Sequence, residues 1–252
     1  MAKWNKFPHD QKSITYAGDA LKKNWDALHK GDSEPFPKEA ALQDAWRAFH
    51  AGNFAEAAEK GEGATVAIKA TSIYATHLEK KDAAKVKLFQ DAMAMAEALM
   101  KKEPKNANAF YQYAYAAGRY SQSVSVVKAL KEGYGGKIKN ALETALKLDA
   151  KHADAHTAMG AYHAEIIDKV GAMIGKLTYG ANKDAAIEHY EKAVKLNPSS
   201  PIAHIEYGNG LMMLLGGKGE DKAVALYEKA IKLKPRDAME VLDIEAAKEE
   251  LE

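Results

Sequence analysis

A thirteen-residue segment, here called the phrase, occurs twice in similar form, and this repetition constrains the fold more than any other feature of the sequence. "AIEHYEKAVKLNP" ends at Pro198, and "AVALYEKAIKLKP" ends at Pro235. In the first phrase Ala186, Tyr190 and Ala193 are spaced four and three residues apart, which places them on one face of a helix. The small residues let a second helix approach closely, and the tyrosine fills the space beside them. A phrase that recurs at such a period predicts a stack of similar helical units.

Two weaker copies precede these phrases, and a second kind of helix follows each copy. The weaker copies end at Ala150 and at Pro104. The residues that take the repeated positions in them are Ile138, Leu142 and Ala145, and Ala92, Ala96 and Leu99. The second helices carry Phe110, His156 and His204 at one shared position, and Ala114, Gly160 and Gly208 four residues later. The sequence therefore predicts helix pairs that cross at a small residue.

This alternation resembles the tetratricopeptide repeat (TPR) over about residues 40–235, and "FHAGNFAEAAE" (Phe49 to Glu59) resembles the turn of that repeat. The resemblance implies an all-α fold, a right-handed TPR-like α-solenoid of about four helix pairs. Pro104 to Ala150 spans 46 residues and Ala150 to Pro198 spans 48, against the usual 34. The excess lies between the two helices of a repeat, so we expect elongated helices or insertions there, all on one side of the stack.

The long insertions narrow the resemblance to one branch of the TPR proteins. The layout is similar to that of the T-component proteins of tripartite (TRAP) transporters and of the regulator-of-microtubule-dynamics proteins, most clearly over residues 150–235. Relatives of this kind are usually exported lipoproteins or membrane-anchored. This chain has no cysteine to carry a lipid, so their cellular setting is not carried over.

Three segments are expected. Residues 1–38 should form an N-terminal capping helix, running over about residues 10–30, and a Pro-rich linker; Ile14, Ala17, Leu21, Trp25 and Leu28 make its apolar stripe. Residues 39–235 should hold the repeats with their insertions. Residues 236–252 should form a C-terminal capping helix that seals the last repeat with Met239, Leu242 and Ala246.

Composition excludes several classes of function. The 36 basic residues are balanced by 35 acidic ones, which argues against a nucleic-acid-binding protein. The absence of cysteine removes disulfides, thiolate nucleophiles and cysteine-based zinc sites. No secretory signal and no membrane-spanning stretch is recognisable, so the expected compartment is the cytoplasm.

No sequence motif indicates an enzyme or a bound cofactor. "VGAMIGKLT" misses the phosphate-loop pattern, because Gly171 and Gly175 are separated by three residues rather than four. His152, His156 and His163 fall roughly on one helix face, as metal-binding histidines do. Since His156 occupies a position where this repeat places a large packing residue, we interpret these histidines as core residues and expect no metal.

The leading hypothesis is a non-enzymatic binding or scaffold protein that holds a protein or peptide partner in the concave groove of the solenoid. From the resemblance, the first helix of each pair lines this groove. The residues expected to bind the partner are Asn108, Tyr111, Tyr115, Arg119, Thr157, Glu165, Asn209, Met212 and Met213, with Asp154, Ala161 and Ile205 also facing inward. Aromatic residues and arginine dominate binding energies at interfaces, and methionine adapts to varied apolar partners. The alternative for Tyr111 and Tyr115 is packing against a neighbouring insertion.

Two other functions stay open. One is a carrier of a small apolar ligand enclosed by the inserted helices, as the TRAP T-component resemblance suggests; a closed apolar cavity of several hundred Å3 would favour it. The second insertion supports this interpretation, since its apolar stripe must be buried somewhere: Ile166, Val170, Met173, Ile174 and Leu177. The other is a metal-dependent enzyme that uses His156 and His163. Self-association into a homo-oligomer is compatible with all three functions.

Overall fold

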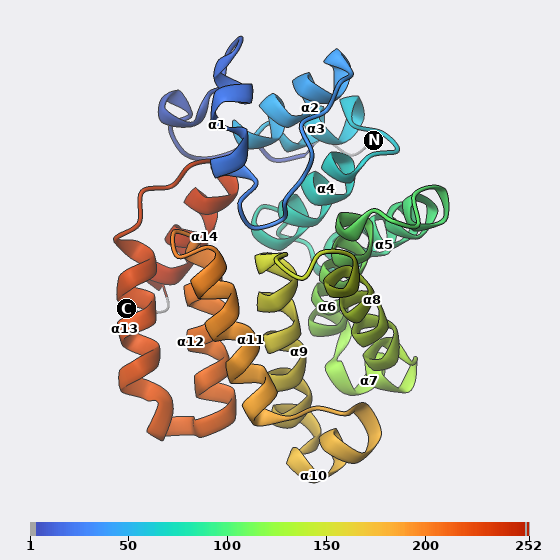
Figure 1. Cartoon of the computed structure of the whole chain (residues 1–252), viewed down its shortest axis with the longest axis vertical. Helices are drawn as coiled ribbons and strands as arrows, with labels where there is room; N and C mark the ends of the chain where they lie inside the picture. Colours follow the sequence, from blue (N-terminus) through green and yellow to red (C-terminus); the bar gives the residue numbers. More distant parts are fainter. Residues whose placement is uncertain (1–3, 250, 252) are drawn as a thin grey trace.

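The computed structural model, which describes residues 4–249 and 251, is a stack of antiparallel helix pairs (Figure 1). No strand occurs within these described residues. The predicted all-α, TPR-like solenoid is confirmed, with one helix pair more than the four expected. The pairs are α2 (Ala40–His50) with α3 (Phe54–Lys60), α4 (Thr65–His77) with α5 (Asp82–Lys102), α6 (Ala107–Val124) with α8 (Tyr134–Leu148), α9 (Ala153–Val170) with α11 (Lys183–Leu196), and α12 (Pro201–Leu215) with α13 (Glu220–Ile231).

The helices form two layers. The first helices of successive pairs, α4, α6, α9 and α12, contact one another in that order and make the inner layer. The second helices pack against them from outside, and Figure 1 shows α9, α11, α12 and α13 side by side along the long axis. Because consecutive inner helices touch one another, the inner layer is a continuous surface.

Two glycines set the distance between the layers in the last two pairs. A Cβ atom on Gly160 would lie 2.8 Å from the Tyr190 ring, and one on Gly208 would lie 2.5 Å from the Tyr227 ring. Tyr190 is 1% exposed and Tyr227 is 7% exposed. The predicted roles of the small residue and the tyrosine in the repeated phrase are therefore those that the packing shows.

The inner helices begin where a polar side chain satisfies a free backbone N–H group. Asn106 caps α6, His152 caps α9 and Ser200 caps α12, each by accepting from the backbone N–H of the residue three positions later. Such caps satisfy groups that a helix start leaves without an internal partner. Pro201 adds a preset backbone angle at the first position of α12.

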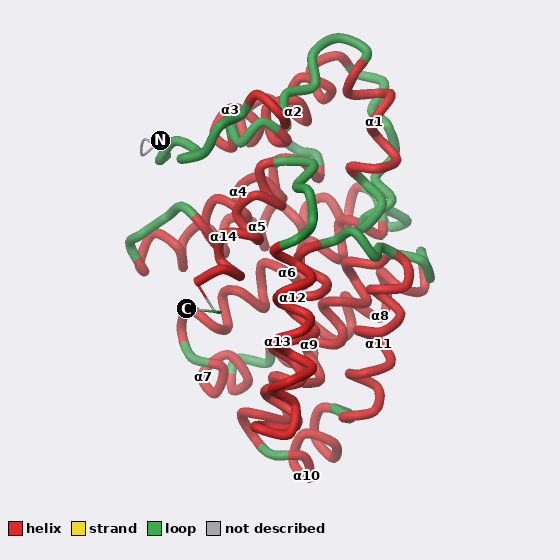
Figure 2. The backbone as a smooth tube through the Cα atoms, turned by 90° about the vertical axis from the view of Figure 1, so that its left-hand side faces the viewer, coloured by secondary structure: helices red, strands yellow, loops and turns green. Residues whose placement is uncertain are grey.

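The insertions leave the stack at one end, as predicted. The first insertion contains the short helix α7 (Val126–Lys131), and the second contains α10 (Ala172–Ile174) and a π-helical turn, η2 (Gly175–Tyr179). The short excursion η3 (Gly216–Gly219) joins α12 to α13. Figures 1 and 2 show α7 and α10 at the lower end of the molecule. The two insertions touch, because a Cβ on Gly135 would lie 3.0 Å from the Tyr179 ring.

The N-terminal helix is shorter than predicted. The expected helix over about residues 10–30 begins only at α1 (Ala20–Leu28), and residues Lys12–Ile14 form a separate 3-10 turn, η1. The break spans Thr15, which is extended with φ −99° and ψ 124°, to Gly18, whose φ of 54° is a left-handed value that a continuing helix does not allow. The stripe itself is correct in part, since Ile14, Leu21 and Trp25 are buried. Residues 1–3 of the predicted N-terminal segment lie outside the described residues.

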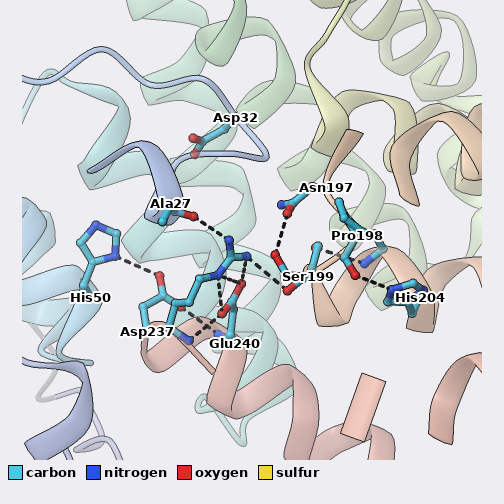
Figure 3. Close-up of polar contacts among 12 residues, drawn as sticks. Ala27, Asp32, His50, Asn197, Pro198, Ser199, His204, Asp237 and Glu240 are labelled. Atoms are coloured by element: carbon cyan, nitrogen blue, oxygen red, sulfur yellow. Dashed lines mark hydrogen bonds and ion pairs between the residues drawn. The ribbon is translucent and has the colours of Figure 1, made fainter. Parts of the chain in front are cut away.

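The C-terminal segment connects the two ends of the stack (Figure 3). In the loop before α14 (Ala238–Glu249), Arg236 donates from Nη1 to the carbonyl of Ala27 over 2.6 Å, and Asp237 Oδ2 is 2.9 Å from His50 Nδ1. Leu242 of α14 is buried in the cluster formed by the first helices. The helix thus contacts α2 as well as α12 and α13, where the sequence predicted a cover over the last repeat alone. Residues 250 and 252 of that segment lie outside the described residues.

Candidate binding cleft

A cleft of about 120 Å3 lies between the inner helices and the first insertion. It is lined by residues of α6, α7, α8 and α9, together with Ile202 and Glu206 of α12. The apolar part of its wall comes mainly from the insertion and the helices beside it: Val126, Ala129, Leu130, Ile138, Leu142 and Ile166. The polar part comes from the inner helices.

Arg119 holds the polar part of the cleft together. Its Nη2 donates to Glu206 Oε1 over 2.7 Å, which joins α6 to α12. The guanidinium also lies 5.4 Å from the centre of the Tyr115 ring, within the range of a cation–π contact. The charge of Arg119 is therefore already matched by Glu206 and is not free to attract an anion.

Two carboxylates of the cleft, Asp154 and Glu165, form no ion pair with any other described residue, although Lys69 acts on Asp154 and Arg119 on Glu165 from a greater distance. Gln122 donates from Nε2 to Glu165 Oε1, and within the described residues no hydrogen bond reaches the side chain of Asp154. Burial raises the pKa of Asp154 to about 7, against the opposite effect of Lys69. Burial also raises the pKa of Glu165, while the bond from Gln122 lowers it. Both groups thus lie where a cation or hydrogen-bond donor would restore solvation that the fold has removed.

Five of the nine predicted partner-binding residues line this cleft: Tyr111, Tyr115, Arg119, Thr157 and Glu165. Asp154 and Ala161, also predicted to face inward, line it too. The two tyrosines differ in exposure. Tyr111 is 9% exposed, with its ring 4.8 Å from that of His152, whereas Tyr115 is half-buried and its hydroxyl pairs with Thr76 Oγ1.

The other four predicted residues lie outside the cleft. Asn108 is buried, where it donates to Glu34 Oε2 over 2.6 Å and contacts His152. Asn209 accepts a hydrogen bond from the Tyr227 hydroxyl. Met213 packs against the cluster around Tyr190, and Met212 is 38% exposed on α12. The structure thus brings together the predicted residues of α6 and α9 other than Asn108, and it leaves those of α12 outside the cleft.

The sequence did not identify the insertion as a wall of the cleft. The sequence signal for this wall is the segment "VVKALK", in which the apolar residues Val126, Ala129 and Leu130 are three and one positions apart. The prediction that the apolar stripe of the second insertion is buried is also wrong in part. Ile166 is 4% exposed, but Met173 and Leu177 are 77% and 81% exposed, so the stripe is buried only at its base.

The histidines form hydrogen bonds with one another and with the backbone. His156 Nδ1 lies 2.7 Å from His189 Nδ1, and His163 Nδ1 accepts from the backbone N–H of Asn182. Burial lowers the pKa of each of these three histidines to about 4, so they are neutral near pH 7. Across residues 4–249 and 251, no three histidine or carboxylate side chains come together as metal ligands would. His156 and His163, the two histidines of the metal-dependent enzyme hypothesis, thus each have a hydrogen-bond partner within the protein.

Comparison with protein families identifies the branch of the TPR proteins to which the chain is related. The family described as regulator of microtubule dynamics protein 1-3 matches residues 54–251, which is most of the chain. The chain belongs to this family. A search of curated proteins gave no match. The family match confirms the resemblance drawn from the long insertions, and it covers α3 to α14.

A solved structure supports the TPR-like architecture of this family member. The thermophilic TPR protein TTC0263 from Thermus thermophilus matches with a TM-score of 0.56 and 17% identity, over 82% of this chain and 96% of that one. The MamA protein (TM-score 0.39, 20% identity, 76% and 88% covered) and YrrB, a TPR protein with an unusual peptide-binding site (0.40, 15%, 91% and 96%), superpose too loosely to bear on the cleft. No described helix has the length and apolarity needed to cross a membrane.

Proposed function

We propose that the chain is a non-enzymatic binding protein that holds a segment of a partner protein on its inner helices, in the cytoplasm. One apolar side chain of that segment occupies the cleft, and two basic side chains, one toward each end of the cleft, face Asp154 and Glu165, which are eleven residues apart on α9. The observation that carries the proposal is the combination, along one cleft, of an apolar wall and two carboxylates that form no ion pair with another described residue.

The size of the cleft supports a side chain as the occupant. Its volume of about 120 Å3 is close to that of an apolar protein cavity of about 150 Å3 that binds benzene. A leucine or phenylalanine side chain fits this space, and burying one contributes about 1.5–3 kcal/mol. That amount corresponds to roughly a 10- to 150-fold gain in affinity.

The second candidate is the carrier of a small apolar ligand. One observation favours it: α7, which supplies three wall residues, lies between Ser125 and Gly133, whose φ values of 132° and 81° both fall outside the helical range. A rotation at these two residues would move α7 as a unit and enlarge the cleft. Native mass spectrometry of the purified protein distinguishes the candidates, because a carrier retains a small ligand of defined mass.

The test of the proposal is the selection of peptides from a random library on the immobilised protein. We expect the selected peptides to share a large apolar residue with lysine or arginine nearby. Their affinity should fall at least about tenfold in Ala161→Trp, which fills the cleft, and less steeply in Glu165→Gln, which removes one charge. The matched control is Ala83→Trp, which places the same side chain on the exposed surface of α5.

Two results would contradict the proposal. Selected peptides without a shared apolar residue would remove the anchor from the argument. Selected peptides that bind Ala161→Trp and Ala83→Trp with equal affinity would place the binding surface elsewhere on the protein. Circular dichroism of each variant establishes that the helical fold is retained before affinities are compared.

A further inference from the structure

The two long insertions carry several large apolar side chains that are exposed to solvent. Among the described residues, Leu177 (81%), Met173 (77%), Ile174 (55%) and Val127 (50%) exceed every other large apolar side chain in exposed fraction. Three of them lie within five consecutive residues of α10 and η2, and the fourth lies on α7. These two elements lie at the same end of the molecule (Figures 1 and 2). We call these four residues, with the lysines around them, the tip surface.

The tip surface carries more positive charge than the rest of the chain. Residues 125–139 and 166–184 hold seven lysines and three carboxylates, a net charge of +4, whereas the whole chain has a net charge of +1. The lysines are Lys128, Lys131, Lys137, Lys139, Lys169, Lys176 and Lys183. Most of them are exposed. The remainder of the molecule is therefore slightly acidic. Lys128, Lys139 and Lys169 each lie within 4.0 Å of a carboxylate, so the positive charge of the tip surface comes mainly from the other four lysines.

The two insertions present this charge on one connected surface. Tyr179, at the end of η2, packs beside Gly135 at the start of α8, and Lys139 Nζ is 2.8 Å from the position of a Cβ on Gly180. Gly171 and Gly180 bracket the hairpin with φ values of 80° and 65°. These turns direct Met173 and Leu177 away from the stack, where their exposure shows that no other part of the described chain covers them.

We propose that the tip surface binds the surface of a membrane that contains anionic lipids, with Met173, Ile174 and Leu177 inserted at the level of the headgroups and the lysines on the lipid phosphates. Apolar side chains ringed by lysine are typical of segments that lie in a bilayer interface, where anionic lipids attract the lysines. Lysine is depleted in protein–protein interfaces, which makes a protein partner the less fitting occupant. This inference does not depend on the proposed function of the cleft.

The experiment is co-sedimentation of the full chain with vesicles of phosphatidylcholine, either pure or mixed with phosphatidylserine. We expect binding to the mixed vesicles, weakened by high salt because exposed charges are screened. Met173→Ser with Leu177→Ser should reduce this binding at least about tenfold. Lys131→Glu with Lys176→Glu should reduce it by a similar factor.

The chain offers a matched control for each pair of changes. Leu148→Ser alters an exposed apolar residue at the end of α8, which is 39% exposed, and should leave vesicle binding unchanged. Lys101→Glu with Lys102→Glu changes the net charge by the same amount on exposed positions of α5 and should have a small effect. None of these changes should alter the affinity for cleft-binding peptides.

Several results would overturn the inference. They are the absence of sedimentation with mixed vesicles, equal sedimentation with pure and mixed vesicles, and binding that survives Met173→Ser with Leu177→Ser. Sedimentation velocity without lipid adds a fourth: a dimer that dissociates in the same double variant would assign the tip surface to self-association instead of to a membrane.

Discussion

Substitution of Gly208 by alanine tests the packing on which the whole stack depends. A Cβ at this position would lie 2.5 Å from Tyr227 Cε1 and 2.9 Å from Cζ, whereas carbon atoms pack at about 3.5–4.0 Å. The ring cannot move freely, because it is 7% exposed and its hydroxyl donates to Asn209 Oδ1 over 2.6 Å. Overpacking of this kind costs about 1–3 kcal/mol.

The higher helix propensity of alanine stabilises the variant, so its contribution must be subtracted from the cost of overpacking. Alanine stabilises a helix interior by about 1 kcal/mol relative to glycine. We therefore expect Gly208→Ala to destabilise the protein by about 1 kcal/mol. Gly118→Ala is the control, since no described atom outside its own turn of helix lies within 4 Å of its Cβ position, and it should stabilise the protein by up to about 1 kcal/mol.

The assay is urea unfolding followed by circular dichroism, with wild type and both variants compared at the same protein concentration. Adding Tyr227→Leu should convert the effect of Gly208→Ala from destabilising to stabilising, because the ring is removed. The reasoning is refuted when Gly208→Ala stabilises the wild-type protein as much as Gly118→Ala does.

Titratable side chains that the fold removes from water give three further predictions. Asp237→Ala should cost about 2–4 kcal/mol of unfolding free energy because His50 loses its partner, whereas Asp91→Asn, in an exposed ion pair, should cost less than about 0.5 kcal/mol by the same urea assay. Burial lowers the pKa of His189 to about 4, so this histidine is neutral in the folded state and protonated in the unfolded state between about pH 4 and 6.5; its contribution to stability is lost as the pH falls through that window, and His189→Gln should make the melting temperature fall less steeply there. Since burial raises the pKa of Asp154 to about 7, the affinity for a basic cleft-binding peptide should drop from about pH 8 to about pH 6, and calorimetry should show no such drop in Asp154→Asn.

The regular part of the fold was predictable because each repeat uses the same local rule. Ala186, Tyr190 and Ala193 set the helix face, and Gly160 and Gly208 set the crossing points; all of these roles depend on residues that are near in sequence or recur at the repeat period. The location of the insertions followed from counting residues between copies. These inferences needed no knowledge of contacts between distant segments.

The rest depended on contacts that the sequence does not encode locally. The stripe of residues 10–30 continues through Gly18, and only the fold shows that the chain turns there. The pairing of His50 with Asp237 joins residues 187 positions apart. In the cleft, the residues on α6 and α9 were predictable from repeat positions, but the wall supplied by α7 depends on how the first insertion folds back, which no repeat pattern specifies.

The affinity of a selected peptide for wild type and for Ala161→Trp, measured side by side with Ala83→Trp, tests the central claim most directly. If the cleft holds the anchor of a partner, the wild type and Ala83→Trp bind alike and Ala161→Trp binds at least about tenfold more weakly. Equal affinities for all three proteins would contradict it.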